Sequence, residues 1–226
     1  MGRVCDFSAE APAKQTEGAH RVSTDEMTGI QALERKHPTV PMRPGRVERR
    51  EFEYVRHGTQ CLIANFEVAT GTVITPSIGP TRTEADFAAH IEATIRIDPD
   101  AEWVFLVDQL NTHQSEALVR LVARHCPVEN DLGEKGERGL LQSMATRAAF
   151  LSDASHRIRF VYTPKHSSWL NQIEIWFSIL VRRLLRRGSF ASVEELREQI
   201  LAFIAYFNRT MAKPFRWTYT GRPLAV

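Results

Sequence analysis

Three acidic residues are the strongest candidates for chemistry in this chain of 226 residues. Asp25 and Asp108 each follow a segment predicted to be a strand, and Glu174 lies in a segment predicted to be a helix. Two carboxylates at strand ends and a third on a helix are suited to Mg²⁺, because this hard cation prefers oxygen ligands and keeps several waters. The three cysteines are scattered and offer no CxxC pair, which argues against a zinc finger.

The surroundings of two of these acids are informative. Asp108 directly follows the apolar run at residues 103–107, which is typical of a strand buried on both faces. Open α/β sheets bind ligands at the carboxyl ends of their strands. Glu174 lies among apolar residues, where an unpaired carboxylate would be costly. It either points to a cation or a basic partner, or lies in water at the margin of the apolar stripe. Asn171, one helical turn earlier, could contact a metal-bound water or a phosphate.

Hydrophobic patterning predicts the elements that position the acids. Residues 19–24 form a short strand candidate, and residues 60–68 and 72–75 predict a β-hairpin. Prolines between residues 38 and 44 predict an extended connection before this hairpin. Residues 83–97 predict an amphipathic helix that begins with a Thr-x-x-Asp capping pattern.

The second half of the sequence predicts a further strand at residues 158–162 and helices at residues 115–125, 169–187 and 193–208. We expect the helix at residues 169–187 to be capped by the residues just before it. We interpret residues 126–155 as an insertion between core elements. The order of elements predicts an α/β fold with a mixed sheet flanked by helices, in an RNase H-like arrangement.

Length and composition limit the class of protein. The content of 43% apolar and 25% charged residues is that of an ordinary globular protein, without a run of about 18 apolar residues to span a bilayer. An odd number of cysteines and no secretory signal indicate reduced thiols and a cytoplasmic protein. We expect a tail or remnant of an upstream element at residues 1–18 that contributes little to the core, one domain at residues 19–210 and a C-terminal tail at residues 211–226.

Charge is distributed unevenly, although the net charge is only +2. Residues 156–226 contain 12 Lys and Arg against 4 Asp and Glu, whereas residues 1–155 contain 17 against 23. This asymmetry suits a protein that holds a polyanion along one face and gathers carboxylates elsewhere to hold a metal ion. A solvated basic surface is the alternative.

Three segments resemble a known family. They are residues 23–35 (STDEMTGIQALER), 107–113 (VDQLNTH) and 163–177 (TPKHSSWLNQIEIWF), and each contains one of the acids. They look like the acid-bearing motifs of bacterial mariner-type transposases, the insertion-sequence-630 family, and they occur in the family's order. The resemblance covers residues 18–224 and implies an RNase H-like DDE endonuclease domain that acts on DNA.

The resemblance also implies roles for single residues. The family's catalytic, metal-binding triad falls on Asp25, Asp108 and Glu174. Supporting positions matched by the motifs are Asn111, His113, His166 and Asn171. We expect DNA phosphates to be bound by Lys165, Arg182, Arg183, Arg186 and Arg187. The four arginines could instead be a solvated helix end, favoured by the helix dipole.

An intact triad would hold two Mg²⁺ or Mn²⁺ ions about 4 Å apart, for strand cleavage and strand transfer without a covalent protein–DNA intermediate. The resemblance implies terminal inverted repeats and target DNA as partners, a homodimer on DNA, and a bacterial, nucleoid-associated protein.

The sequence departs from the family at two places. Asp108 and Glu174 are 66 positions apart, about twice the family's common spacing, and the excess matches residues 126–155. The family's N-terminal helix-turn-helix domains have no counterpart here, so we expect an N-terminally truncated chain. Two alternatives therefore stay open: an inactive remnant that acts as a DNA-binding or oligomerising module, or another RNase H-like nuclease such as a resolvase.

Overall fold

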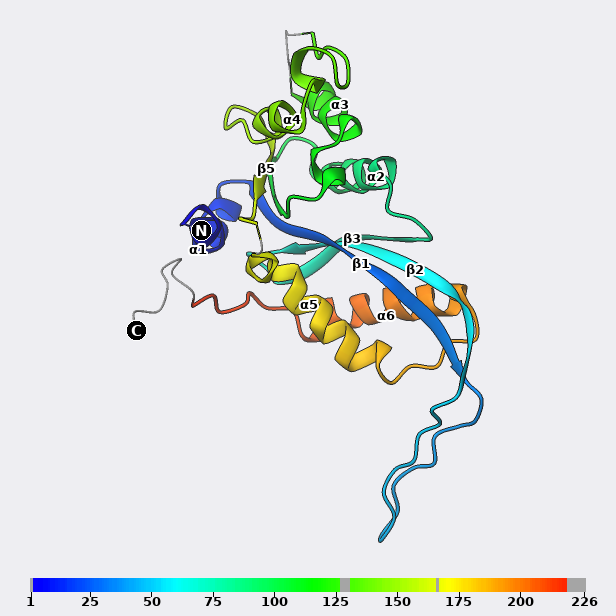
Figure 1. Cartoon of the computed structure of the whole chain (residues 1–226). Helices are drawn as coiled ribbons and strands as arrows, with labels where there is room; N and C mark the ends of the chain where they lie inside the picture. The colour runs from blue at the N-terminus through cyan, green and yellow to red at the C-terminus, as the bar shows by residue number, and fades with distance from the viewer. Residues whose placement is uncertain (1, 127–130, 166, 219–226) are drawn as a thin grey trace, which may run out of the picture.

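A five-stranded sheet forms the centre of the computed structural model, which describes residues 2–126, 131–165 and 167–218 (Figure 1). The strands are β1 (Ala19–Arg35), β2 (Tyr54–Glu67), β3 (Thr72–Gly79), β4 (Glu102–Val107) and β5 (Ile158–Tyr162). They lie in the order β3-β2-β1-β4-β5. The pairs β1–β2 and β2–β3 are antiparallel, and β1–β4 and β4–β5 are parallel. The predicted α/β fold with a mixed sheet is confirmed.

Helices cover both faces of the sheet (Figure 1). One layer contains α1 (Gly2–Thr16), α5 (Gln172–Leu180) and α6 (Val193–Thr210). The other contains α2 (Glu84–Ile95), α3 (Glu116–His125) and α4 (Met144–Leu151). The short helical segments are η1 (Asn111–Gln114), η2 (Gly139–Leu141), η3 (Ser168–Leu170) and the π-helix η4 (Val181–Leu185). Among the described residues, no helix combines the length and apolar character needed to cross a membrane.

Strand β1 is much longer than the short strand predicted before Asp25. It runs for 17 residues, because Ile30 and Ala32 are buried while Gln31 between them faces solvent, which continues the period-two pattern of a strand. Beyond its end the chain continues as a two-stranded arm that projects from the sheet, with bridges Val40–Arg49 and Arg43–Arg46 (Figure 1). The extended connection predicted from the prolines is this arm.

The expectation that residues 1–18 contribute little to the core is wrong. Helix α1 buries Val4, Phe7 and Ala11, which are 2%, 1% and 0% exposed, in the same cluster as α5 and α6. These residues are three and four positions apart, which is the spacing of one helix face. Pro12 lies inside the helix and interrupts the helical signal in the sequence.

The second half of residues 126–155, the segment interpreted as an insertion, packs into the core. Leu141 and Leu151 are fully buried in the cluster around α2 and α3. The buried Arg147 guanidinium donates to the carbonyl oxygens of Gln114 (2.7 Å) and Leu141 (2.9 Å), which ties α4 to η1. The contacts of α4 therefore belong to the domain core.

Replacing Leu141 with Ala should lower the free energy of unfolding by about 2–5 kcal/mol, because the change leaves a cavity beside α3 and α4. Chemical denaturation measures this loss. Leu140→Ala is the matched control: its side chain is only partly buried, so its loss should be clearly smaller. Equal, small losses in both variants would show that this segment lies outside the cooperative core.

Candidate active site

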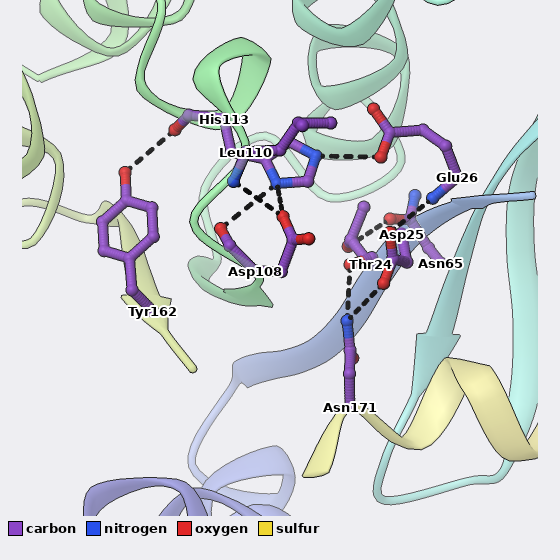
Figure 2. A network of polar contacts seen from close by, with 9 residues as sticks. All are labelled: Thr24, Asp25, Glu26, Asn65, Asp108, Leu110, His113, Tyr162 and Asn171. Carbon is purple, nitrogen blue, oxygen red and sulfur yellow. Dashed lines mark hydrogen bonds and ion pairs between the residues drawn. The ribbon is translucent and has the colours of Figure 1, made fainter. Parts of the chain in front are cut away.

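The parallel pairing of β1 and β4 brings Asp25 and Asp108 to the same part of the sheet (Figure 2). Ser23 lies opposite Leu106, and each aspartate follows two residues after this pair. Asp108 directly follows β4, as predicted. Asp25 instead lies within β1, because its strand continues by antiparallel pairing with β2.

Glu174 joins the two aspartates from the first turn of α5. Its half-buried carboxyl group lies close enough to Asp25 and Asp108 for both acids to act on its pKa. Among the described residues, Glu174 has no ion pair with a basic side chain, and its polar neighbours are the other two acids. The three predicted acids come together from β1, the end of β4 and α5.

The pKa values of the three acids are shifted in different directions from their ordinary values. Burial raises the pKa of Asp25 to about 7, and the nearby charges of Asp108 and Glu26 add to the shift. Burial and the charge of Asp108 also raise the pKa of Glu174. Burial acts on Asp108 in the same direction, but donors to its carboxylate outweigh it and lower its pKa. The site therefore concentrates negative charge that is costly at neutral pH unless a cation or a proton compensates it.

Asn171 ties the start of α5 to β1 (Figure 2). Its fully buried side chain donates to the carbonyl oxygen of Thr24 (3.0 Å) and to Oδ2 of Asp25 (3.2 Å). Ser23 Oγ donates to Asn171 Oδ1 and accepts from the N–H of Ile173 (2.9 Å). Ser23 thus caps α5 from another element.

This contact explains where α5 begins. Helix α5 starts at Gln172, three residues later than the helix predicted at residues 169–187, because Ser168–Leu170 form the separate 3₁₀ turn η3. The expected cap just before residue 169 is wrong, since Asn171 occupies the N-cap position and its side chain bonds to β1. The helical path continues from α5 through the π-helix η4.

His113 and Glu26 form a buried link behind Asp108 (Figure 2). His113 Nδ1 donates to Asp108 Oδ1 (2.8 Å), and His113 Nε2 donates to Glu26 Oε2 (3.1 Å). Burial lowers the pKa of His113, but the two carboxylates outweigh it and raise the pKa to about 10. His113 was predicted as a supporting residue, whereas Glu26 was not, because its only signal in the sequence is its position next to Asp25.

The donor set of the three acids suits a hard divalent cation, because it consists of oxygen atoms. Oδ1 of the Asp108 carboxylate accepts from the Leu110 N–H (2.9 Å) and from His113. No donor among the described residues binds Oδ2, which is left for another partner. In the described ranges, however, no three His, Cys, Asp or Glu side chains are arranged as a ready metal site. The oxygen donors of the partly exposed Asp108 and Glu174 nevertheless fit a hard cation in their chemistry.

The other predicted site residues lie in different places. Lys165 is exposed and, with Asp108, lines a cavity of about 700 Å³ between the end of β5 and the start of α4. Asn111 is exposed on η1, and no contact of the acid network involves it among the residues described. His166 lies outside the described residues.

The four predicted arginines are exposed at and after η4. Three of them, Arg182, Arg183 and Arg187, line a groove of about 550 Å³ together with Ile179 and Met211. The N–H of Arg186 bonds to the Val181 carbonyl oxygen five residues earlier (2.8 Å). This π-helical winding places residues five apart on one face, so Arg182 and Arg187 share the groove. Arg186 is not among its lining residues.

Comparison with known proteins identifies a family and a similar fold. A family model described as "DDE superfamily endonuclease" matches residues 20–197. Similar solved structures are the Mos1 mariner paired end complex with Mn (TM-score 0.53, 14% identity), a pre-cleavage Mos1 transpososome (0.53, 16%) and the Mos1 strand transfer complex (0.51, 14%). No curated protein matches.

The matches to the Mos1 structures cover 91% of this chain and 53–55% of theirs, so the chain spans about half of their length. At this identity the likeness concerns the fold, and it confirms the predicted RNase H-like arrangement of the sheet and helices. The family model, in contrast, matches the sequence itself over most of its length. The chain belongs to the DDE superfamily of endonucleases.

Proposed function

We propose that this chain is the catalytic domain of a bacterial mariner-type transposase, which cleaves DNA strands at insertion-sequence ends and transfers them to target DNA. The meeting of Asp25, Asp108 and Glu174 on an endonuclease fold is the observation that supports this. Each acid comes from a different element, and the site lies beside the 700 Å³ cavity that Asp108 and Lys165 line.

In this proposal the three acids are the catalytic residues and the ligands of Mg²⁺ or Mn²⁺. Two bound ions would supply activation of the attacking oxygen and stabilisation of the leaving oxygen in phosphoryl transfer. The chain's own part is to hold the carboxylates in place: Asn171 holds Asp25 by Oδ2, and His113 holds Asp108 by Oδ1. No serine or tyrosine nucleophile is required, because the attacking group is not a protein side chain.

We further propose that DNA is the partner and that two copies act together on a pair of transposon ends. The groove lined by Arg182, Arg183 and Arg187 would bind the phosphate backbone, and Lys165 would bind phosphate beside the site. Such contacts position DNA without specifying its sequence.

A nicking assay tests the proposed activity. The chain is incubated with duplexes that carry terminal inverted repeats, in Mg²⁺ or Mn²⁺, and with branched DNA of equal length. We expect metal-dependent cleavage of the inverted-repeat duplexes. Preference for branched DNA would indicate a resolvase-like nuclease, and binding without cleavage would indicate an inactive DNA-binding remnant.

Replacing all four arginines with Ala should weaken binding to every DNA sequence alike. Each lost phosphate contact should lower the slope of log K against log salt by about 0.9, so we expect a slope reduced by roughly 2–4. Titrations at several salt concentrations measure this slope.

The groove supplies a matched control for this prediction. Arg187→Ala should lower the slope by about 0.9, whereas Arg186→Ala, one residue away and also exposed, should lower it less because Arg186 does not line the groove. Unchanged affinity and slope in the four-site variant would show that the arginines are only a solvated helix end.

A further inference from the structure

The acid network contains a glutamate that neither the proposed chemistry nor the DNA groove uses. Asp25 and Glu26 are neighbours on β1, and successive side chains of a strand point to opposite faces. Asp25 contacts α5 through Asn171, whereas Glu26 reaches His113 on the face covered by α2 and α3. Strand β1 therefore contributes a side chain to the acid network on each face of the sheet.

The ring of His113 is buried and packed on several sides. The His113 side chain is 0% exposed, and its ring packs against the ring of Phe87 at a centroid distance of 4.3 Å. The backbone carbonyl oxygen of His113 accepts a hydrogen bond from the Tyr162 hydroxyl (2.9 Å). The Glu26 side chain is 1% exposed, so water does not compete for its bond to His113. A shift of Glu26 would therefore be transmitted through the ring to Asp108.

Stability alone does not account for a glutamate at this position. Its second oxygen, Oε1, is buried and has no hydrogen-bond partner among the described residues. A buried carboxylate oxygen without a partner costs stability, and an apolar side chain of similar size would avoid this cost. The residue therefore needs a role that an apolar residue could not fill.

We infer that Glu26 is a positioning residue: by fixing the buried ring of His113, it holds Asp108 by Oδ1 and keeps Oδ2 available for a divalent cation. The arrangement resembles the outer-shell carboxylates that orient the histidine ligands of metal sites, except that the oriented ligand here is a carboxylate. This inference rests on the proposed function, since it assumes that Asp108 binds the cation.

The test measures Mn²⁺ binding to the whole chain by calorimetry, without DNA and without any assay of cleavage. Glu26→Leu should weaken Mn²⁺ binding by about 10- to 100-fold, the range typical of lost outer-shell partners. Glu26→Gln should stay close to the wild type, because its amide oxygen still accepts from His113 Nε2. A loss in Glu26→Gln as large as in Glu26→Leu would overturn the positioning role in favour of a role of charge alone.

Two further variants keep the test decisive. His113→Asn can still donate to Asp108 but is too short to reach Glu26, so it should weaken Mn²⁺ binding as Glu26→Leu does. Glu67→Leu is the matched control, because it removes another buried glutamate paired with a histidine, His20 (2.5 Å), away from the acids. Its Mn²⁺ affinity should equal that of the wild type.

Circular dichroism and thermal unfolding establish that each variant is folded. Wild-type affinity in folded Glu26→Leu and His113→Asn would overturn the inference while leaving the three acids as the proposed site. A wild-type chain whose Mn²⁺ binding is absent, or does not respond to Asp108→Asn, would overturn the proposed function and this inference with it.

Discussion

Replacing Asp108 with Asn should reduce metal-dependent DNA cleavage by about a thousandfold or more. The change keeps the size of the side chain but removes the negative charge that would hold the cation. A metal ion contributes several kcal/mol to transition-state stabilisation, and each 1.36 kcal/mol corresponds to a factor of ten in rate. Single-turnover cleavage of an inverted-repeat duplex measures the effect.

The same variant should remain folded. The amide oxygen of Asn can still accept from the Leu110 N–H and from His113, so the loss of unfolding free energy should stay near 1–2 kcal/mol. Asp153→Asn is a suitable control, because this exposed acid bonds only to its neighbour Ser155 among the described residues. Full activity in Asp108→Asn would eliminate the proposed triad.

Replacing Asp25 with Asn should stabilise the metal-free protein at pH 8 by up to about 4 kcal/mol. The pKa of Asp25 is about 7 in the folded chain and 3.8 as its ordinary value. The folded protein therefore keeps a proton that the unfolded chain loses as pH rises through 3.8. The stability that this proton contributes is complete below pH 3.8 and is lost as pH rises to about 7.

The Asn side chain does not titrate, so the gain in Asp25→Asn should be near zero at pH 4, grow between pH 4 and 7, and level off above pH 7. Denaturation curves of both proteins across this range, in a chelating buffer, measure the gain. Mn²⁺ should raise the unfolding free energy of the wild type and have much less effect on the variant. A gain that is independent of pH would show that Asp25 is ionised in the folded chain throughout this range.

The sequence predicted best where the signal is local. The capping box of Thr83 and Asp86 starts α2 as expected, because all its atoms lie within four residues. The apolar run before Asp108 is a buried strand, and strand pairing then places its end beside β1. Residue types and local patterns were enough to predict the mixed sheet and to place Asp108 at the end of a buried strand.

The sequence predicted poorly where a contact joins distant segments. The link between Glu26 and His113 spans 87 positions, and the cap that Ser23 provides for Ile173 spans 150. Spacing in the sequence carries no information about such contacts, because the folded sheet alone brings the partners together. For the same reason the start of α5 was placed too early, and the core role of Leu141 was missed.

Mn²⁺ soaked into crystals of the chain and located by anomalous scattering tests the central claim most directly. Manganese identifies itself by its anomalous signal, so the measurement does not depend on activity, DNA or partner chains. We expect one or two peaks bound by carboxylate oxygens of Asp25, Asp108 and Glu174, with Asp108 bound through Oδ2. Crystals in which Mn²⁺ binds elsewhere, while the three acids stay closed on one another or pair with arginines, would contradict the account.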